Sequence, residues 1–345
     1  MLFKPLLDGG QLARSKSLTR SIQAAAVGAA VVALCACNLP FDLGLPATRA
    51  VENGAAESLT NATTFALKGT YAGHLGEHWV FGMTVARPGR EQISVSGPSE
   101  QLDAIIIGSQ GYFSGQSFLA KHMGTDPLSQ SLVKAAGSAW WEGSTDLAPK
   151  LPDLIDGAAF RATFLGSNVT KRTDHLAFEG APAIELSGPR ADVFVHATPP
   201  YFVLGLVMRK GVVVDGLGQA DLRYANFNSP LEITVPGDVI DFSNLTTLPP
   251  IYSVVSVDTS GCGSPCVVSA QLKNLGGQYG ASAPSTITFT MKAAASGSVI
   301  GSCQALVTPD VGYNATTTVS CTISLTSQPE NAAVVTATAD NPGHA

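Results

Sequence analysis

Short runs in which apolar and polar residues alternate recur along much of the chain, and they limit the fold more than any other feature. The runs TFALKGTY, HWVFGMTV, QISVSG and QLDAIII place apolar side chains mostly at every second position between residues 64 and 107. A period of two is typical of antiparallel strands with one buried face. Further strands are predicted at 175–179, 183–187, 191–196, 201–208, 219–227 and 231–235.

Helical patterns stand between these groups of strands. Helices are predicted at 49–59, at 126–136 and at 152–164, where Pro152 and Asp153 suit a helix start. The order helix, strands, two helices, strands predicts an α+β fold. About ten strands would curl such a sheet, so we expect a curved antiparallel sheet with helices on its concave side and an apolar cavity between them.

The first 40 residues are typical of an export signal. Arg14, Lys16 and Arg20 precede an apolar run from residue 24 to 36, which is too short to span a bilayer comfortably. The run ends in Leu-Cys-Ala-Cys, which resembles a bacterial lipobox and makes Cys37 the lipidated residue. The alternatives are modification of Cys35, an ordinary signal peptide and an uncleaved anchor. We expect an exported protein, anchored by lipid to the outer face of the bacterial cytoplasmic membrane.

The remaining chain divides by composition into two folded parts. Residues 1–36 form the expected signal peptide and 37–48 a short tether, followed by the α+β body at 49–243. A Pro-rich linker at 244–250 leads to residues 251–345, where Val/Thr/Ile/Ser-rich runs alternate with turn residues. This spacing predicts a small all-β, Ig-like sandwich.

Four cysteines lie in this last part, and four cysteines allow three pairings. A hairpin folded at the turn-like segment around Gly312 would place Cys303 opposite Cys321, leaving Cys262 and Cys266 to close a small loop. A zinc site is the competing interpretation, but it requires thiolates in a reducing compartment. Export therefore favours two disulfides and no metal.

The body resembles the bacterial LppX/LprG-type lipoproteins, which are related to the LolA/LolB lipoprotein carriers. The resemblance rests on the lipobox, tether and first helix, and on four segments over roughly 190 residues. These segments are SLTNATTFALKGTY, AIIIGSQGYFSG with the later Trp pair, LAFEGAPAIELSG with ADVFVHATPPYFVLGLVMRKG, and DLRYANFNSPLEITVPGDVID. The C-terminal sandwich departs from the family pattern.

The resemblance implies a half-barrel whose cavity binds an acylated lipid or glycolipid, which the protein carries across the cell envelope. Such binding needs a deep apolar pocket and no catalytic residue or cofactor, because burial of each CH₂ contributes about 0.8 kcal/mol. The candidate lipid-cavity residues, which could also simply pack a core, are Phe65, Leu67, Trp79, Phe81, Met83, Leu154, Ile155, Val193 and Val195.

Other function classes have weaker support. Net charge is −6, and Lys and Arg form no cluster larger than a pair, so we expect no nucleic-acid partner. His74 and His78 have a metal-like spacing, but they fall where a hairpin turn is predicted. No motif of a hydrolase or nucleotide-binding enzyme is present, so we expect no enzymatic activity. The alternative to a lipid carrier is an envelope scaffold or sensor, whose Ig-like domain binds a protein partner.

Overall fold

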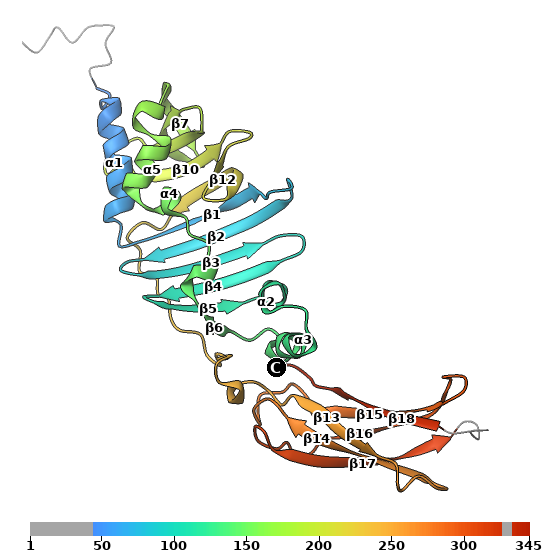
Figure 1. The fold of residues 1–345 in the computed structure, drawn as a ribbon. Coiled ribbons are helices and arrows are strands. Elements are labelled where there is room, and N and C mark those ends of the chain that lie inside the picture. The colour runs from blue at the N-terminus through green and yellow to red at the C-terminus, as the bar shows by residue number, and fades with distance from the viewer. Residues whose placement is uncertain (1–43, 326–332) are drawn as a thin grey trace, which may run out of the picture. The chain divides into compact units, whose positions relative to one another are not determined.

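The computed structural model describes residues 44–325 and 333–345 of the chain. The predicted signal segment 1–36, Cys37 and most of the predicted tether lie outside the described residues. Residues Ala47–Ala345 form one compact unit, which contains the described helices and strands. Two antiparallel sheets and a set of helices build this unit (Figure 1), which establishes an α+β fold in the described residues.

The first sheet has twelve strands, and almost all of them are neighbours in a simple antiparallel order. That order is β6-β5-β4-β3-β2-β1-β12-β10-β9-β8-β7, with β11 paired to β12. The strands are β1 Thr64–Ala72, β2 His78–Ala86, β3 Arg90–Ser96, β4 Gln101–Ile107, β5 Gln110–Ser114, β6 Trp141–Gly143, β7 Lys171–Phe178, β8 Ala181–Ser187, β9 Ala191–His196, β10 Val203–Met208, β11 Val213–Val214 and β12 Leu217–Ala225.

The register of this sheet aligns the apolar positions of successive strands on one face. Phe81 of β2 pairs with Val95 of β3, and Val95 pairs with Leu102 of β4. All three side chains are buried, whereas Ser94 and Ser96 beside Val95 are exposed. The period-two pattern therefore identified the buried face correctly, and the helices pack against that face.

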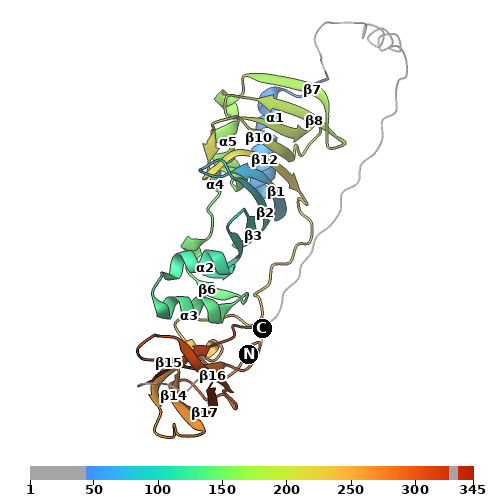
Figure 2. The same cartoon turned by 90° about the vertical axis from the view of Figure 1, so that its right-hand side faces the viewer.

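The helices are α1 Thr48–Asn61, α2 Gln116–Met123, α3 Pro127–Ala136, α4 Pro152–Ile155 and α5 Gly157–Phe164, with short 3₁₀ turns at Thr145–Leu147, Gly166–Asn168 and Leu245–Thr247. Figure 2 shows α2, α4 and α5 on one side of the sheet. The helix predicted at 152–164 is two helices, because Asp156 has extended backbone and caps α5 by accepting the Ala159 N–H at 2.8 Å. Helix α2 was not predicted.

Close packing of α5 on α1 depends on one glycine. A β-carbon on Gly157, at the start of α5, would lie 2.0 Å from the carbonyl oxygen of Ala56 in α1. No other residue type fits there without separating the two helices. The glycine that begins α5 thus sets how tightly α1 and α5 cover the sheet.

The strand predicted at 231–235 is wrong, because this segment forms no regular structure and pairs with no strand. Pro230 and Pro236 flank it and lack the N–H groups that a ladder requires. Ile233 is instead buried against Ala86 and Ile105, in a small cluster separate from the main core. The segment therefore covers part of the sheet face opposite the helices.

The second sheet contains six strands with their own core. They are β13 Tyr252–Asp258, β14 Cys266–Asn274, β15 Thr286–Ala293, β16 Val299–Leu306, β17 Thr316–Leu325 and β18 Ala333–Asp340, in the order β13-β14-β17-β16-β15-β18. Strand β16 pairs with β17 only at Gly301–Leu325 and Ser302–Ser324, whereas both strands pair along most of their length with their other neighbours. The sheet thus divides into two three-stranded parts.

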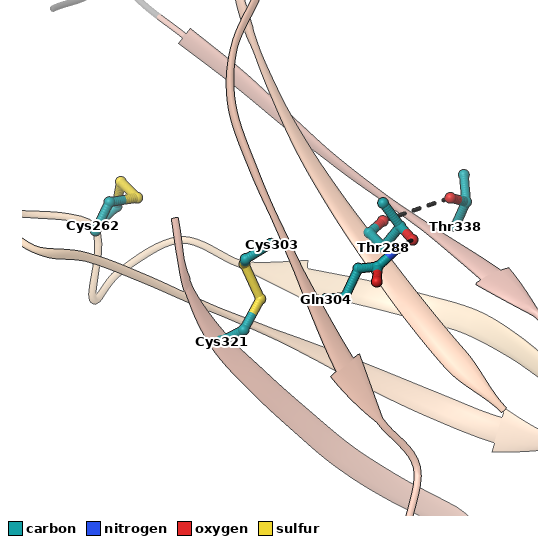
Figure 3. The surroundings of a disulfide bond; sticks show 7 residues. Cys262, Thr288, Cys303, Gln304, Cys321 and Thr338 are labelled. Atoms are coloured by element: carbon teal, nitrogen blue, oxygen red, sulfur yellow. Dashed lines mark hydrogen bonds between the residues drawn. A yellow bond between two sulfur atoms is a disulfide. The ribbon is translucent and has the colours of Figure 1, made fainter. Parts of the chain in front are cut away.

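Both predicted disulfides are present, and one of them links these two parts. Cys303 of β16 is bonded to Cys321 of β17, as Figure 3 shows, and Cys262 is bonded to Cys266. The first bond does not join directly opposite residues of a hairpin, as the sequence had suggested, because the register of the short β16–β17 pairing places Cys303 level with Ile323. It therefore connects the two three-stranded parts of this sheet and does not join opposite positions of one hairpin.

No helix in the described residues is long and apolar enough to span a bilayer.

Arg87 joins the ends of two helices to the sheet. It directly follows β2, and its guanidinium donates to the carbonyl oxygens of Leu59 and Ala62 at the end of α1. Its second terminal nitrogen donates to the carbonyl oxygen of Ile155 at the end of α4, at 2.9 Å. Carbonyl groups at a helix end have no partner within the helix, and a cation there also interacts favourably with the helix dipole. One side chain thus satisfies the open ends of both helices.

We expect Arg87→Met to lower the free energy of unfolding by about 2–4 kcal/mol, because several charged hydrogen bonds to partly buried carbonyls are lost together. Arg90→Met is the matched control, since Arg90 donates a single bond, to the carbonyl of Ile233. Urea unfolding of the full chain, followed by tryptophan fluorescence, measures both. Equal losses in the two variants would contradict the role assigned to Arg87.

Candidate functional site

An apolar cavity of about 280 Å³ lies on the helix-covered face of the large sheet. Strands β1 to β4 and the turn between β3 and β4 contribute one side of it, α2 and β12 contribute walls, and the loop after the 3₁₀ turn Thr145–Leu147 covers it. Its lining residues are Tyr71, Trp79, Phe81, Val95, Glu100, Leu102, Phe118, Leu147, Ala148, Pro149 and Leu217.

The floor of the cavity is the cross-strand row of Phe81, Val95 and Leu102. These residues are opposite one another in neighbouring strands, so their side chains point to the same face. Phe118 of α2 and Leu217 of β12 are also buried. Opposite this row the cavity is lined by Phe118 of the short helix α2 and by Leu147, Ala148 and Pro149, most of which lie in a loop. A loop fills the space less completely than a long helix would.

The more exposed end of the cavity is aromatic and acidic. Tyr71 of β1 pairs in register with Trp79 of β2, and their rings are stacked with centroids 6.1 Å apart. Glu100 lines the same end, with its side chain 17% exposed, and forms an ion pair with Lys121 of α2. The lining of the cavity therefore combines apolar side chains with one charged group, the carboxylate of Glu100.

Negative charge at this end influences Tyr71. The pKa of Tyr71 is raised, first by burial of its hydroxyl and then by the nearby carboxylates of Glu100 and Glu77. Both effects disfavour the phenolate.

A tight turn beside the cavity binds helix α4. Asp215 and Gly216 form the two-residue turn between β11 and β12, with φ of 52° and 80°, which is the left-handed region that such turns require. The Asp215 carboxylate accepts the backbone N–H of Asp153 at 2.9 Å. Burial and the neighbouring Asp153 carboxylate raise the pKa of Asp215 to about 6. Leu217, two residues later, lines the cavity.

The residues predicted to line a lipid cavity share one apolar cluster, but most of them do not line this cavity. Trp79 and Phe81 do. Ile155 is partly buried and packs against the same cluster. The other six are no more than 3% exposed and pack in the core: Phe65, Leu67, Met83, Leu154, Val193 and Val195.

Several lining residues were not predicted. Leu102 and Val95 belonged to recognised alternating runs and could have been found by extending the row from Phe81 across the neighbouring strands. Phe118 lies in the unpredicted helix α2, whose flanking Gly115 and Gly124 provide no side-chain cap. Leu147 and Pro149 lie in a loop without periodicity, so no sequence pattern marks them.

A second, more polar cavity of about 350 Å³ lies between α1 and the turn preceding β10. Tyr201 packs against α1 at Gly54, where a β-carbon would lie 2.5 Å from its ring. The lining includes amide, carboxylate, hydroxyl and aromatic side chains. Its residues are Ala50, Asn53, Gly54, Glu57, Ser58, Asn61, Ala62, Pro199, Pro200, Tyr201, Phe202 and Asn228. It contains none of the predicted cavity residues.

The paired histidines lie where a turn was predicted. His74 is in the turn between β1 and β2, and His78 begins β2. Within residues 44–325 and 333–345, no group of three or more His, Cys, Asp or Glu side chains is arranged to hold a metal ion.

We expect Asp215→Asn to become progressively more stable than the natural chain as pH rises from 4 to 7. The folded-state pKa of Asp215 lies above its ordinary value of 3.8, at about 6. The folded chain therefore keeps this proton more readily than the unfolded chain, and the contribution to stability is lost as pH rises through 6. Urea unfolding at stepped pH measures the difference.

Asp126→Asn is the control for this experiment, because hydrogen bonds from Ser129 and Leu128 lower the pKa of Asp126 instead. Asp126 is ionised in both the folded and the unfolded chain above pH 4, so the stability difference between Asp126→Asn and the natural chain should stay nearly constant from pH 4 to 7. A constant difference between Asp215→Asn and the natural chain over this pH range would contradict the assignment.

Comparison with known proteins identifies no family for this chain. No family model matches it, and no curated protein matches it. Among solved structures, it is similar to MucB in complex with MucA(peri), with 11% identity, 66% of this chain and 75% of that chain covered, and a TM-score of 0.29. It is also similar to the Pseudomonas aeruginosa MucA/MucB complex structure, with 12% identity, 65% and 76% covered, and a TM-score of 0.26. At these TM-scores the likeness supports no inference about function.

Proposed function

We propose that this protein is an exported binding protein that holds an acyl chain in the cavity above Phe81, Val95 and Leu102. The observation that carries the proposal is the cavity itself: about 280 Å³ of apolar space on the covered face of a large sheet. Ligand pockets in proteins typically measure about 300–1,000 Å³, and this cavity lies just below that range, so the ligand we propose for it is a single short chain or one segment of a longer lipid.

The chemistry of the lining supports an apolar ligand. Glu100 is the single charged residue among those that line this cavity, and the floor and walls are aliphatic or aromatic. Transfer of a chain from water gains about 0.8 kcal/mol for each buried CH₂. Eight methylenes would therefore contribute roughly 6 kcal/mol before the entropic cost of binding. The role we propose is binding and carriage, without catalysis.

The location that we propose for the protein rests on its N-terminal segment. Cys37 is the lipidated residue, and the lipid anchor keeps the binding body at the outer face of the cytoplasmic membrane. An acyl ligand would then be taken from, or delivered to, the membrane to which the carrier is anchored. This function is the one implied by the resemblance to the LppX/LprG-type lipoproteins.

A scaffold or sensor role is the second candidate, and exposed apolar residues of the second sheet favour it. Val255, Val299, Leu306 and Val334 are between 54% and 60% exposed, on strands β13, β16 and β18 and beside their turns. Apolar side chains at this exposure are suited to a protein partner. In this alternative the large sheet is a rigid support, and the cavity has no ligand.

We expect Ala148→Phe to abolish binding of decanol, because a phenyl ring at position 148 occupies the cavity that the chain needs. Ala148 lines the cavity and is only 7% exposed. Ala50→Phe is the matched control, since Ala50 lines the second cavity. Isothermal titration calorimetry of decanol into the full chain measures both variants, and a thermal unfolding scan checks that each is folded.

The two variants distinguish the cavities. Loss of binding in Ala148→Phe alone supports the proposal. Loss in Ala50→Phe alone, or no binding of decanol to the natural chain, contradicts it.

A further inference from the structure

We propose that the ligand of the apolar cavity is an amphiphile with a cationic head, an ammonium group, bound between Glu100 and the stacked rings of Tyr71 and Trp79. This inference rests on the proposed function, because it assumes that the cavity holds an acyl chain. It adds the chemical class of the head group, which neither the fold nor the apolar lining specifies.

The fixed charge at the cavity is the carboxylate of Glu100. Its side chain is 17% exposed and lines the cavity, whereas Lys121, its partner, is 55% exposed and does not line it. A long, exposed lysine moves away at little cost, while the glutamate is held at the β3–β4 turn. Once Lys121 has moved aside, a ligand in the cavity faces a negative group.

A second carboxylate lies close to the same rings. A β-carbon on Gly73 would lie 2.3 Å from Oε1 of Glu77 and 2.5 Å from Nε1 of Trp79, so both groups converge at this glycine. Glu77 and Glu100 both act on Tyr71, whose pKa they raise in addition to the effect of burial. A second carboxylate, that of Glu77, thus lies near the indole N–H of Trp79, in addition to Glu100 at the cavity.

Stacked aromatic rings beside carboxylates are suited to a cation. The ring faces of Trp and Tyr attract ammonium groups, and the attraction grows as the group is removed from water. Tyr71 and Trp79 both line the cavity, with rings inclined by only 16° to each other. An anionic head at this position would face two carboxylates instead.

Lys121 then acts as an internal substitute for the head group. In the structure its ammonium donates a hydrogen bond to the carboxylate of Glu100. Phe118, one turn earlier in α2, forms part of the cavity wall. A ligand ammonium that replaces Lys121 would break the ion pair between α2 and Glu100. Binding of the head group is thereby linked to the position of α2, whose Phe118 forms part of the cavity wall.

Three ligands with the same ten-carbon chain test the head group: decylamine, decanol and decanoate, each below its micelle-forming concentration. We expect decylamine to bind the full chain about tenfold more tightly than decanol, and decanoate to bind more weakly than decanol. Glu100→Gln should reduce the preference for decylamine to less than about twofold while decanol affinity is unchanged. Lys121→Met should strengthen decylamine binding several-fold, because the competing ammonium is removed.

Glu232→Gln is the charge-matched control, because Glu232 is exposed beside Ile233, which packs in the cluster on the opposite sheet face. It should leave the order of the three affinities unchanged. Equal affinities for the three ligands, or tightest binding of decanoate, would overturn the cationic head and leave the acyl-chain proposal standing. Failure of all three to bind would overturn the proposed function itself. Unchanged decanol binding in Glu100→Gln shows that this variant is folded, and Lys121→Met tests the proposal independently.

Discussion

Strands β2 to β4 of the large sheet bury mainly one face, and this constraint organises the part of the molecule that contains the cavity. Residues two apart along a strand share a face, so the register that pairs Phe81 with Val95 and Val95 with Leu102 produces an apolar row that must be removed from water. Helices cover much of this face, but opposite the row the cover consists of Phe118 of the short helix α2 and the segment Leu147, Ala148 and Pro149. The cavity is therefore a consequence of incomplete helical cover over a continuous apolar floor.

Polar contacts at helix ends keep that cover in place. Arg87 satisfies the carbonyl ends of α1 and α4, and Asp215 satisfies the N–H of Asp153 at the start of α4. The buried Tyr224 adds a bond from its hydroxyl to the carbonyl of Leu154, at 3.0 Å. These contacts are between segments far apart in the sequence, so the short helices depend on the sheet more than on their own propensity.

Local sequence patterns predicted the buried faces and the two disulfides, while the position of the cavity depends on long-range pairing. Phe65 and Phe81 both follow a period of two, yet only Phe81 lines the cavity. Tertiary packing decides which buried positions are covered closely and which face a cavity. The segment 231–235 alternates like a strand but has prolines at both sides and no partner. Leu217 reaches the cavity through pairing of β12 with β1, which joins residues about 150 apart and leaves no local signal.

The proposed binding of an acyl chain rests on an apolar cavity, the carboxylate of Glu100 and the stacked rings of Tyr71 and Trp79. The most direct test is native mass spectrometry of the full chain, purified without detergent from a host that contains lipids. The account predicts an added mass that organic solvent extracts as an acylated amphiphile, and that is absent from Ala148→Phe. A chain that carries no added mass, and acquires none after incubation with mixed lipids, would contradict the account.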